Sequence, residues 1–299
     1  MNKIDKNESA VVIIGSGAGG GTMAYELTKA GIPCVCLEAG SYIKPEDYTS
    51  DEWGAFMQMA WLDARGTSGS WRVNKDFPGL PAWIVKAVGG TTTHWAGATP
   101  RFMDYEFKTR STYGNVDGAN LLDWPVSLDE MEPYYDKAEK AIGSTHRHGR
   151  PPLPANNNYK VFANGAENVG YKFYATGPYG TNAEPYDGRP GSIQDGFNFQ
   201  GDKNTSKWST AVREIPRALK TGLLDLRPNS HVIQITHDKA GNANSVLYVD
   251  ENGDIQRQKA KVVCVAGNSI ESPRLLLLSA SSMFPDGLAN SSGQVGRNY

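Results

Sequence analysis

The sequence predicts an α/β fold built on a parallel β-sheet. Residues 9–40 run in the order apolar strand, glycine-rich turn, helix and second apolar strand. The order of strand, turn and helix returns at 260–281, and a β-hairpin precedes it. Alternating strands and helices are typical of parallel pairing, and strands that are buried on both faces appear as uninterrupted apolar runs.

The first unit is divided by its helix breakers. Residues 11–14 are continuously apolar and form the first predicted strand. Residues 21–30 are expected to form a helix that ends at Gly31 and Pro33, because glycine terminates helices and proline cannot continue them. The apolar run at 34–37 then forms the second strand.

Two further helices are predicted before the hairpin. One is expected near 51–62, where bulky apolar residues recur at helical spacing. The other lies within 123–143, where Ser127 or Asp129 can cap the start and Gly143 can close the end.

Residues 144–208 form a polar stretch rich in glycine, proline and asparagine. So long a segment with little regular pattern is more typical of a functional lid, an insertion or a partner-facing surface than of a simple linker. Regular structure returns at 231–238 and 244–258, which read as hairpin strands, with a turn at Asn252-Gly253.

Composition and charge exclude several classes of function. The 299 residues are 39% hydrophobic and 21% charged with a net charge of −2, and no basic block supports nucleic-acid binding. No signal peptide and no transmembrane run is visible, so a cytoplasmic location is expected. Cys34, Cys36 and Cys264 lie in apolar runs, which indicates buried core thiols rather than a disulfide or metal ligands.

Gly15, Gly17 and Gly20 form a G-x-G-x-x-G motif between the first strand and its helix. The first glycine makes the tight turn, the second lets a pyrophosphate approach the backbone, and the third allows close helix–strand packing. Glu38 ends the second strand, where a ribose hydroxyl needs a carboxylate acceptor. The motif therefore predicts an adenine dinucleotide, either FAD or NAD.

The stretch "AVGGTTTHWAGATPR" at 87–101 suggests a second close approach of the backbone to a ligand, as an extended dinucleotide requires. Its His94 can be a metal ligand, a base, a flavin contact or a core histidine, and taken alone it reads as a core histidine. No metal site is predicted, because no thiols and no clear ligand spacing accompany the histidines at 94, 146, 148, 231 and 237. His146 and His148 are expected to be solvated.

Four stretches together resemble the N-terminal half of the glucose–methanol–choline (GMC) oxidoreductases. They are "VVIIGSGAGGG…CLEAG", "AVGGTTTHWAGATPR", "DWPVSLDEMEPYYDKAE" and "AGNSIESPRLLLLSAS". Within the family, the chain is most similar in appearance to bacterial sugar dehydrogenase large subunits and pyranose oxidases.

The resemblance implies an FAD-binding, Rossmann-like βαβ fold with a β-hairpin insertion. It places the first part of the FAD domain at 1–108, a helical and loop-rich insertion at 109–208 and the second part of the FAD domain at 209–299. The fold would be incomplete without a C-terminal substrate domain, expected beyond 299.

The resemblance also implies where FAD lies. The pyrophosphate would lie on Gly15, Gly17 and Gly20, the adenosine ribose on Glu38, and the adenine against the backbone of Val232. In pyranose oxidases the matching histidine is bonded to the flavin, whereas in sugar dehydrogenases a similar His-Trp accompanies unbonded flavin, so both states stay open for His94. The cofactor-binding residues implied are Gly15, Ser16, Gly17, Ala18, Gly20, Glu38, Ala39, Gly89, Gly90, Thr91, Thr92, His94, Trp95, Ala96, Gly97, Val232, Ala266 and Gly267.

Two departures from the family pattern matter. Several relatives carry a cysteine-rich iron–sulfur loop after a stretch like "PYDGRP" at 185–190, but residues 191–203 contain no cysteine, so no cluster is expected there. The chain also stops at a phrase found mid-protein in the family, so the catalytic His-His or His-Asn pair is expected after Tyr299.

By resemblance, the complete enzyme oxidises a hydroxyl of a sugar, glycoside or polyol, with a histidine as base and hydride transfer to flavin N5. The isolated chain is expected to be inactive. A small subunit and an electron-acceptor protein are expected partners, and a signal-bearing subunit could carry the chain to the periplasm. The alternatives are an NAD-dependent Rossmann dehydrogenase and a non-catalytic nucleotide-binding fragment or assembly subunit.

The sequence also offers a set of tryptophans, at 53, 61, 71, 83 and 95, that could stack sugars. Aromatic packing beneath the cofactor is the preferred interpretation for most of them.

Overall fold

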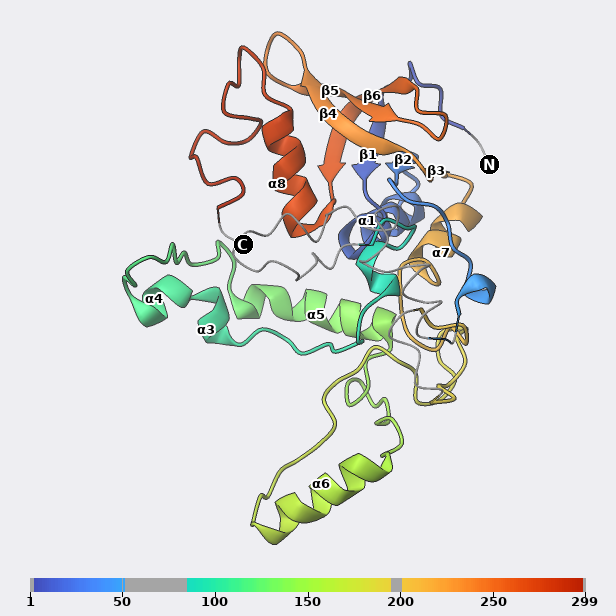
Figure 1. The fold of residues 1–299 in the computed structure, drawn as a ribbon, viewed down its shortest axis with the longest axis vertical. Helices are drawn as coiled ribbons and strands as arrows, with labels where there is room; N and C mark the ends of the chain where they lie inside the picture. Colours follow the sequence, from blue (N-terminus) through green and yellow to red (C-terminus); the bar gives the residue numbers. More distant parts are fainter. Residues whose placement is uncertain (1–2, 50, 52–84, 195–200, 298–299) are drawn as a thin grey trace. The chain divides into compact units, whose positions relative to one another are not determined.

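The computed structural model describes residues 3–49, 51, 85–194 and 201–297 (Figure 1). The chain divides into two compact units, the first formed by 1–95, 196–203 and 209–299 and the second by 96–195 and 204–208. The predicted helix near 51–62 and the tryptophans at 53, 61, 71 and 83 lie outside the described residues.

The first unit contains a six-stranded sheet in the order β3-β2-β1-β6-β5-β4. Four strands are parallel: β1 (Ala10–Ile14), β2 (Cys34–Leu37), β3 (Leu224–Arg227) and the second half of β6 (Ile255–Val265). The antiparallel hairpin strands β4 (His231–His237) and β5 (Ala243–Val249) extend the sheet through the first half of β6. The predicted α/β class with a hairpin insertion is confirmed.

The two faces of the sheet bury alternate residues of the central strands. Val12 and Ile14 of β1 pack with apolar side chains of the hairpin and of helix α8 (Asn268–Leu278). Val11 and Ile13 point to the opposite face, toward α1 (Ala18–Lys29) and α7 (Glu214–Lys220). Because both faces of β1 are covered, all five of its residues are buried, as the uninterrupted apolar run predicts.

Four elements of the first unit differ from the prediction. Helix α1 begins at Ala18 rather than at residue 21, so Gly17 is its N-cap and Gly20 already belongs to its first turn. The residues predicted as a hairpin strand and a separate core strand form one strand, β6, with an irregularity in its register to β1 between Ala10 and Val11. Strand β3 and helix α7 had no clear sequence signal, since both are short.

The cysteines lie where the apolar runs place them. Cys34 and Cys36 are fully buried in β2, and Cys264 is half-buried in β6. Burial raises the pKa of Cys34 to about 12 and holds the pKa of Cys36 well above its ordinary value. These thiols behave as small apolar core residues.

The second unit is built from helices and long loops. It contains α3 (Asp104–Phe107), α4 (Thr109–Tyr113), α5 (Leu128–Ile142) and α6 (Asn157–Asn168). Helix α5 starts with the predicted Ser127 cap, which forms a capping box with Glu130, and it ends at Gly143 in the left-handed conformation.

Helix α6 is a correction to the sequence analysis, which treated residues 144–208 as lacking regular structure. The Asn156 side chain accepts a hydrogen bond from the Tyr159 N–H at 2.8 Å and caps the helix. The surrounding glycines and prolines outweighed this signal in the sequence. In the part of the chain that the structure describes, no helix is both long and apolar enough to span a membrane.

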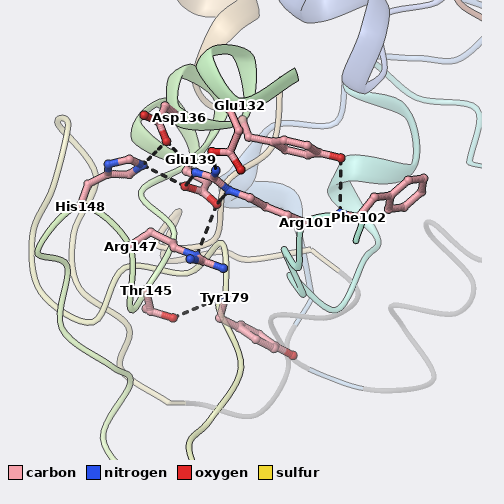
Figure 2. Close-up of polar contacts among 10 residues, drawn as sticks. Arg101, Phe102, Glu132, Asp136, Glu139, Thr145, Arg147, His148 and Tyr179 are labelled. Atoms are coloured by element: carbon pink, nitrogen blue, oxygen red, sulfur yellow. Dashed lines mark hydrogen bonds and ion pairs between the residues drawn. The ribbon is translucent and has the colours of Figure 1, made fainter. Parts of the chain in front are cut away.

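An ion-pair cluster ties the start of the second unit to α5 (Figure 2). The Arg101 guanidinium donates to both carboxylate oxygens of the buried Glu139, at 2.7 and 2.6 Å. Asp136 accepts from Arg101 at 2.6 Å, and His148 Nε2 lies 2.9 Å from Glu139 Oε2. Arg101 thus neutralises a carboxylate that burial would otherwise destabilise.

His148 is exposed, as predicted, and it also joins this cluster through its hydrogen bond to Glu139. Asp136, Glu139 and His148 each offer a ligand atom within 4.8 Å of the others, a spacing that could hold a metal ion. Arg101 already bonds both carboxylates, so a cation would have to compete with the guanidinium charge.

Candidate functional site

A cavity of about 260 Å³ opens in the first unit where the parallel strands end. Ile14, Leu37 and Val265, the last residues of β1, β2 and β6, line it. In doubly wound sheets, ligands bind in the crevice outside the carboxyl ends of the strands. The remaining walls come from the glycine turn before α1, from residues 85–92, from the start of β4 and from α8.

The glycines of the first turn serve two distinct purposes. Gly15 has a φ of +92°, and a Cβ there would lie 2.5 Å from the Ala266 carbonyl oxygen. A Cβ on Gly20 would lie 1.9 Å from the Gly15 carbonyl oxygen, so these two glycines are required by the protein's own packing.

Gly17 is different. It has a φ of −64°, and the protein atoms nearest to an added Cβ would be 3.8 and 3.9 Å away, at ordinary contact distance. The protein itself therefore tolerates a side chain at this position. Gly17 lines the cavity at the N-terminus of α1, so a ligand approaching the backbone explains the glycine.

Glu38 presents a buried carboxylate to the cavity. Its Oε2 accepts from the Ser16 N–H at 3.0 Å and the Ser16 hydroxyl at 2.7 Å, and its Oε1 accepts from the Gly40 N–H at 3.0 Å. Burial raises the pKa of Glu38 above its ordinary value, and these hydrogen bonds oppose the rise. The Ala39 backbone also lowers this pKa through a hydrogen bond, so the chain itself orients the carboxylate at the cavity wall.

The second glycine turn lies against the first. Residues Gly90–Thr93 form a short 3₁₀ helix, η2, that follows Gly89 in the left-handed conformation. A Cβ on Gly90 would lie 2.9 Å from the Gly17 Cα, so the two backbones meet at this point. The Gly89 N–H donates to the Ser16 hydroxyl at 3.0 Å, which links the second turn to Glu38 through one side chain.

The structure brings most of the residues predicted to bind the cofactor to one cavity. Those that line it are Gly15, Gly17, Ala18, Glu38, Ala39, Gly90, Thr91, Thr92, Val232, Ala266 and Gly267. Ser16, Gly20 and Gly89 lie behind its wall, where they connect or pack the turns. Ala96 and Gly97 belong to the second compact unit.

His94 is a buried side chain at the end of η2. The exposed fraction of His94 is 2%, and its backbone N–H donates to the Thr91 carbonyl at 3.0 Å. Trp95 follows as a half-buried residue. A role for either at the flavin stays a prediction.

Several residues of the cavity wall were missed by the sequence analysis, namely Val85, Lys86, Ser230, His231, Asn268, Glu271, Ser272 and Arg274. Arg274 pairs with Glu271 at 2.9 Å on the first two turns of α8. Burial, followed by the charge of Lys86, lowers the pKa of His231. These eight residues lie outside the two glycine motifs. Two signals in the sequence could have found some of them: His231 immediately precedes Val232, and Asn268 begins the helix of the second strand–turn–helix unit.

The residues present fit an extended adenine dinucleotide. Gly17 leaves room at a helix N-terminus for a pyrophosphate, and Glu38 places on the cavity wall a carboxylate, the group that accepts a hydrogen bond from a ribose hydroxyl in such sites. Val232 and residues Gly90–Thr92 of the second glycine turn line the same cavity. These features suit FAD and do not by themselves separate it from NAD.

Comparison with known proteins narrows the choice between FAD and NAD. The sequence model of the family described as GMC oxidoreductase matches residues 80–299. The chain is 31% identical, over 97% of its length, to 54% of a 2-methyl-1,2-propanediol dehydrogenase from Mycolicibacterium austroafricanum. It is 29% identical, over 96% of its length, to 57% of a fructose dehydrogenase large subunit from Gluconobacter japonicus.

Its fold is similar to that of an FAD-dependent oxidoreductase from Chaetomium thermophilum, with a TM-score of 0.61 at 17% identity. That similarity covers 91% of this chain and 48% of the other. The chain thus spans about half the length of the curated relatives it matches.

Proposed function

The chain belongs to the GMC oxidoreductase family, a family of flavoproteins, and from this premise we propose that it binds FAD as the flavin-binding part of an alcohol or sugar oxidoreductase. The room at Gly17 beside the buried Glu38 carboxylate is the observation that carries the proposal. When bound, FAD supplies a hydride acceptor for oxidation of a carbon that bears a hydroxyl group.

In this proposal, each group of the cavity wall has one task. The N–H groups at the start of α1 bind the pyrophosphate, and Gly17 lets them come close. Glu38 accepts a hydrogen bond from the adenosine ribose, and Ser16 orients its carboxylate. The backbone of Val232 meets the adenine, and the turn at 89–93 supports the flavin end.

The substrate in this proposal is a sugar, a glycoside or a polyol. The support is the chemistry printed in the relatives' names, a propanediol for one and fructose for the other. Both are hydroxyl compounds oxidised by a dehydrogenase. The base that takes the hydroxyl proton is not among the residues assigned here.

The proposal extends to partners. The fructose dehydrogenase relative is named as a large subunit, which supports a small subunit for this protein. We also propose an electron-acceptor protein. We propose a cytoplasmic location, or a periplasmic one if the protein is exported together with a signal-bearing subunit.

Anaerobic reduction of the bound flavin tests the proposal. The purified whole protein is mixed with glucose, fructose, glycerol or 1,2-propanediol, and flavin absorbance is followed. Bleaching by at least one of them, with turnover when an artificial electron acceptor is added, is the expected result. Bound NAD instead of flavin, or flavin that no hydroxyl compound reduces, would contradict the proposal.

A second experiment decides the state of His94. The protein is precipitated with acid, and the yellow colour is measured in the pellet and in the supernatant. Colour in the pellet that disappears in His94→Ala supports a covalent bond, whereas free FAD in the supernatant shows that the flavin is held without one.

A further inference from the structure

A buried hydrogen-bond network joins the two glycine turns behind the cavity wall. The Thr210 hydroxyl donates to the Ser16 carbonyl at 2.8 Å. The Thr210 N–H donates to the Thr92 hydroxyl at 3.2 Å, and that hydroxyl in turn donates to the Gly89 carbonyl. Thr210 therefore bonds the first turn through its hydroxyl. It bonds the second turn through its backbone N–H and also through its hydroxyl, which lies 3.4 Å from the Thr92 hydroxyl and 3.5 Å from the Gly89 carbonyl oxygen.

Thr210 is held firmly in place. It is fully buried, and it lies just before α7, whose Ile215 and Ala218 pack in one apolar cluster with Ala24 of α1. A Cβ on Gly21 would lie 2.5 Å from the Thr210 Cβ, so α1 itself approaches this side chain closely. Thr210 does not line the cavity, and any effect it has on a ligand must pass through the turns.

We propose that Thr210 is a positioning residue that fixes the separation of the two turns so that one extended dinucleotide can contact both. The inference rests on the proposed function, because it needs a ligand that spans the turns. A binding site loses affinity when its supporting groups allow its contacts to shift by about 1 Å. Thr210 bonds directly to Ser16 and to Thr92, one residue in each turn, and so supports the direct hydrogen bond from the Gly89 N–H to the Ser16 hydroxyl.

The competing interpretation is that Thr210 is an ordinary core threonine. Thr28 provides the matched control, because it is also buried and its hydroxyl donates to a backbone carbonyl, that of Ala24 at 2.8 Å. Thr28 lies at the end of α1 away from both turns. Each hydroxyl donates to two backbone carbonyls, so removal of either takes a donor from buried carbonyls, but of the two residues only Thr210 connects to the cavity wall.

The experiment compares FAD affinity in the whole protein carrying Thr210→Val, Thr210→Ser or Thr28→Val. FAD is removed, the apoprotein is titrated with FAD, and the visible circular dichroism of the bound flavin is recorded. We expect Thr210→Val to bind FAD about tenfold more weakly with an altered flavin spectrum. Thr210→Ser is expected to stay within about twofold of the parent, and Thr28→Val to match the parent.

Parent-like affinity and spectrum in Thr210→Val would overturn the inference, as would an equal loss in Thr28→Val. An equal loss in Thr210→Ser would also overturn it, because the hydroxyl would then not be the group that matters. If Thr210→Val does not fold, Thr210→Ala is the second hydroxyl-free variant, with the same tenfold loss expected. A parent protein that binds no FAD would instead refute the proposed function.

Discussion

Gly17→Ala separates a glycine required by a ligand from glycines required by the fold. The added methyl group would lie 3.8 Å from the Gly90 Cα and 3.9 Å from the Gly89 carbonyl oxygen, and the φ of −64° suits alanine. Alanine is a poorer helix cap than glycine by about 0.5–1 kcal/mol, but it lowers the entropy of the unfolded chain by a similar amount. The free energy of unfolding should therefore change by less than about 1 kcal/mol.

The effect on binding should be much larger. In the proposed binding mode the methyl group takes up space that the pyrophosphate needs, and overpacking of this kind costs about 2–3 kcal/mol, or on the order of 100-fold in affinity. Gly20→Ala should instead lower the free energy of unfolding even without a ligand, because its Cβ would lie 1.9 Å from the Gly15 carbonyl oxygen.

Urea unfolding of the apoprotein and titration with FAD measure the two effects separately. Gly165→Ala in α6 is the control, since nothing lies within 4 Å of its added Cβ, and it should leave FAD affinity unchanged. The reasoning fails if Gly17→Ala binds FAD as tightly as the parent, or if it unfolds as readily as Gly20→Ala.

Three further predictions follow from buried groups. Because burial raises the pKa of Glu38, the folded protein holds a proton on this carboxyl more tightly than the unfolded chain does, so the free energy of unfolding should fall as pH rises above 4.5. Urea unfolding at a series of pH values measures this fall, and Glu38→Gln should remove the part of it that Glu38 causes. Arg101→Ala leaves the buried Glu139 carboxylate without its main partner and should lower the free energy of unfolding in urea by about 1–3 kcal/mol. Lys108→Ala removes an exposed ion pair and should lower it by less than about 0.5 kcal/mol; equal losses would contradict the role of the cluster. With a pKa of about 12, Cys34 is a thiolate in roughly one molecule in 10⁴ at pH 8, so a thiol reagent should label Cys34 and Cys36 only after unfolding, and fast labelling of the folded protein would show that these thiols are not in the core.

The sequence predicted best those elements whose physics is local. The apolar runs at 11–14 and 34–37 became strands β1 and β2, and the Ser127 and Gly143 caps delimit α5. Each of these elements is determined by a run of side chains or by a cap that can be read within a few residues. The glycine motif and Glu38 likewise came together in one cavity because a βαβ unit places them at the same sheet edge.

The rest depends on contacts between distant residues. Thr210 and Ser16 are hydrogen-bonded although 194 residues separate them in the sequence, and Arg101 and Glu139 although 38 residues do. A single sequence carries no periodic signal over such separations. Strand β3 is four residues long and is stabilised by its parallel pairing with β2. The capped helix α6 was hidden by the glycines and prolines around it.

The nucleotide carried by the purified protein tests the central claim most directly. The protein is isolated without added cofactor, its absorbance spectrum is recorded, and the nucleotide released by denaturation or proteolysis is identified by chromatography and mass spectrometry. One FAD per chain in the parent, with a marked loss in Gly17→Ala, is the result we predict. A parent protein that carries NAD or no nucleotide, and that gains no flavin when FAD is supplied, would contradict it.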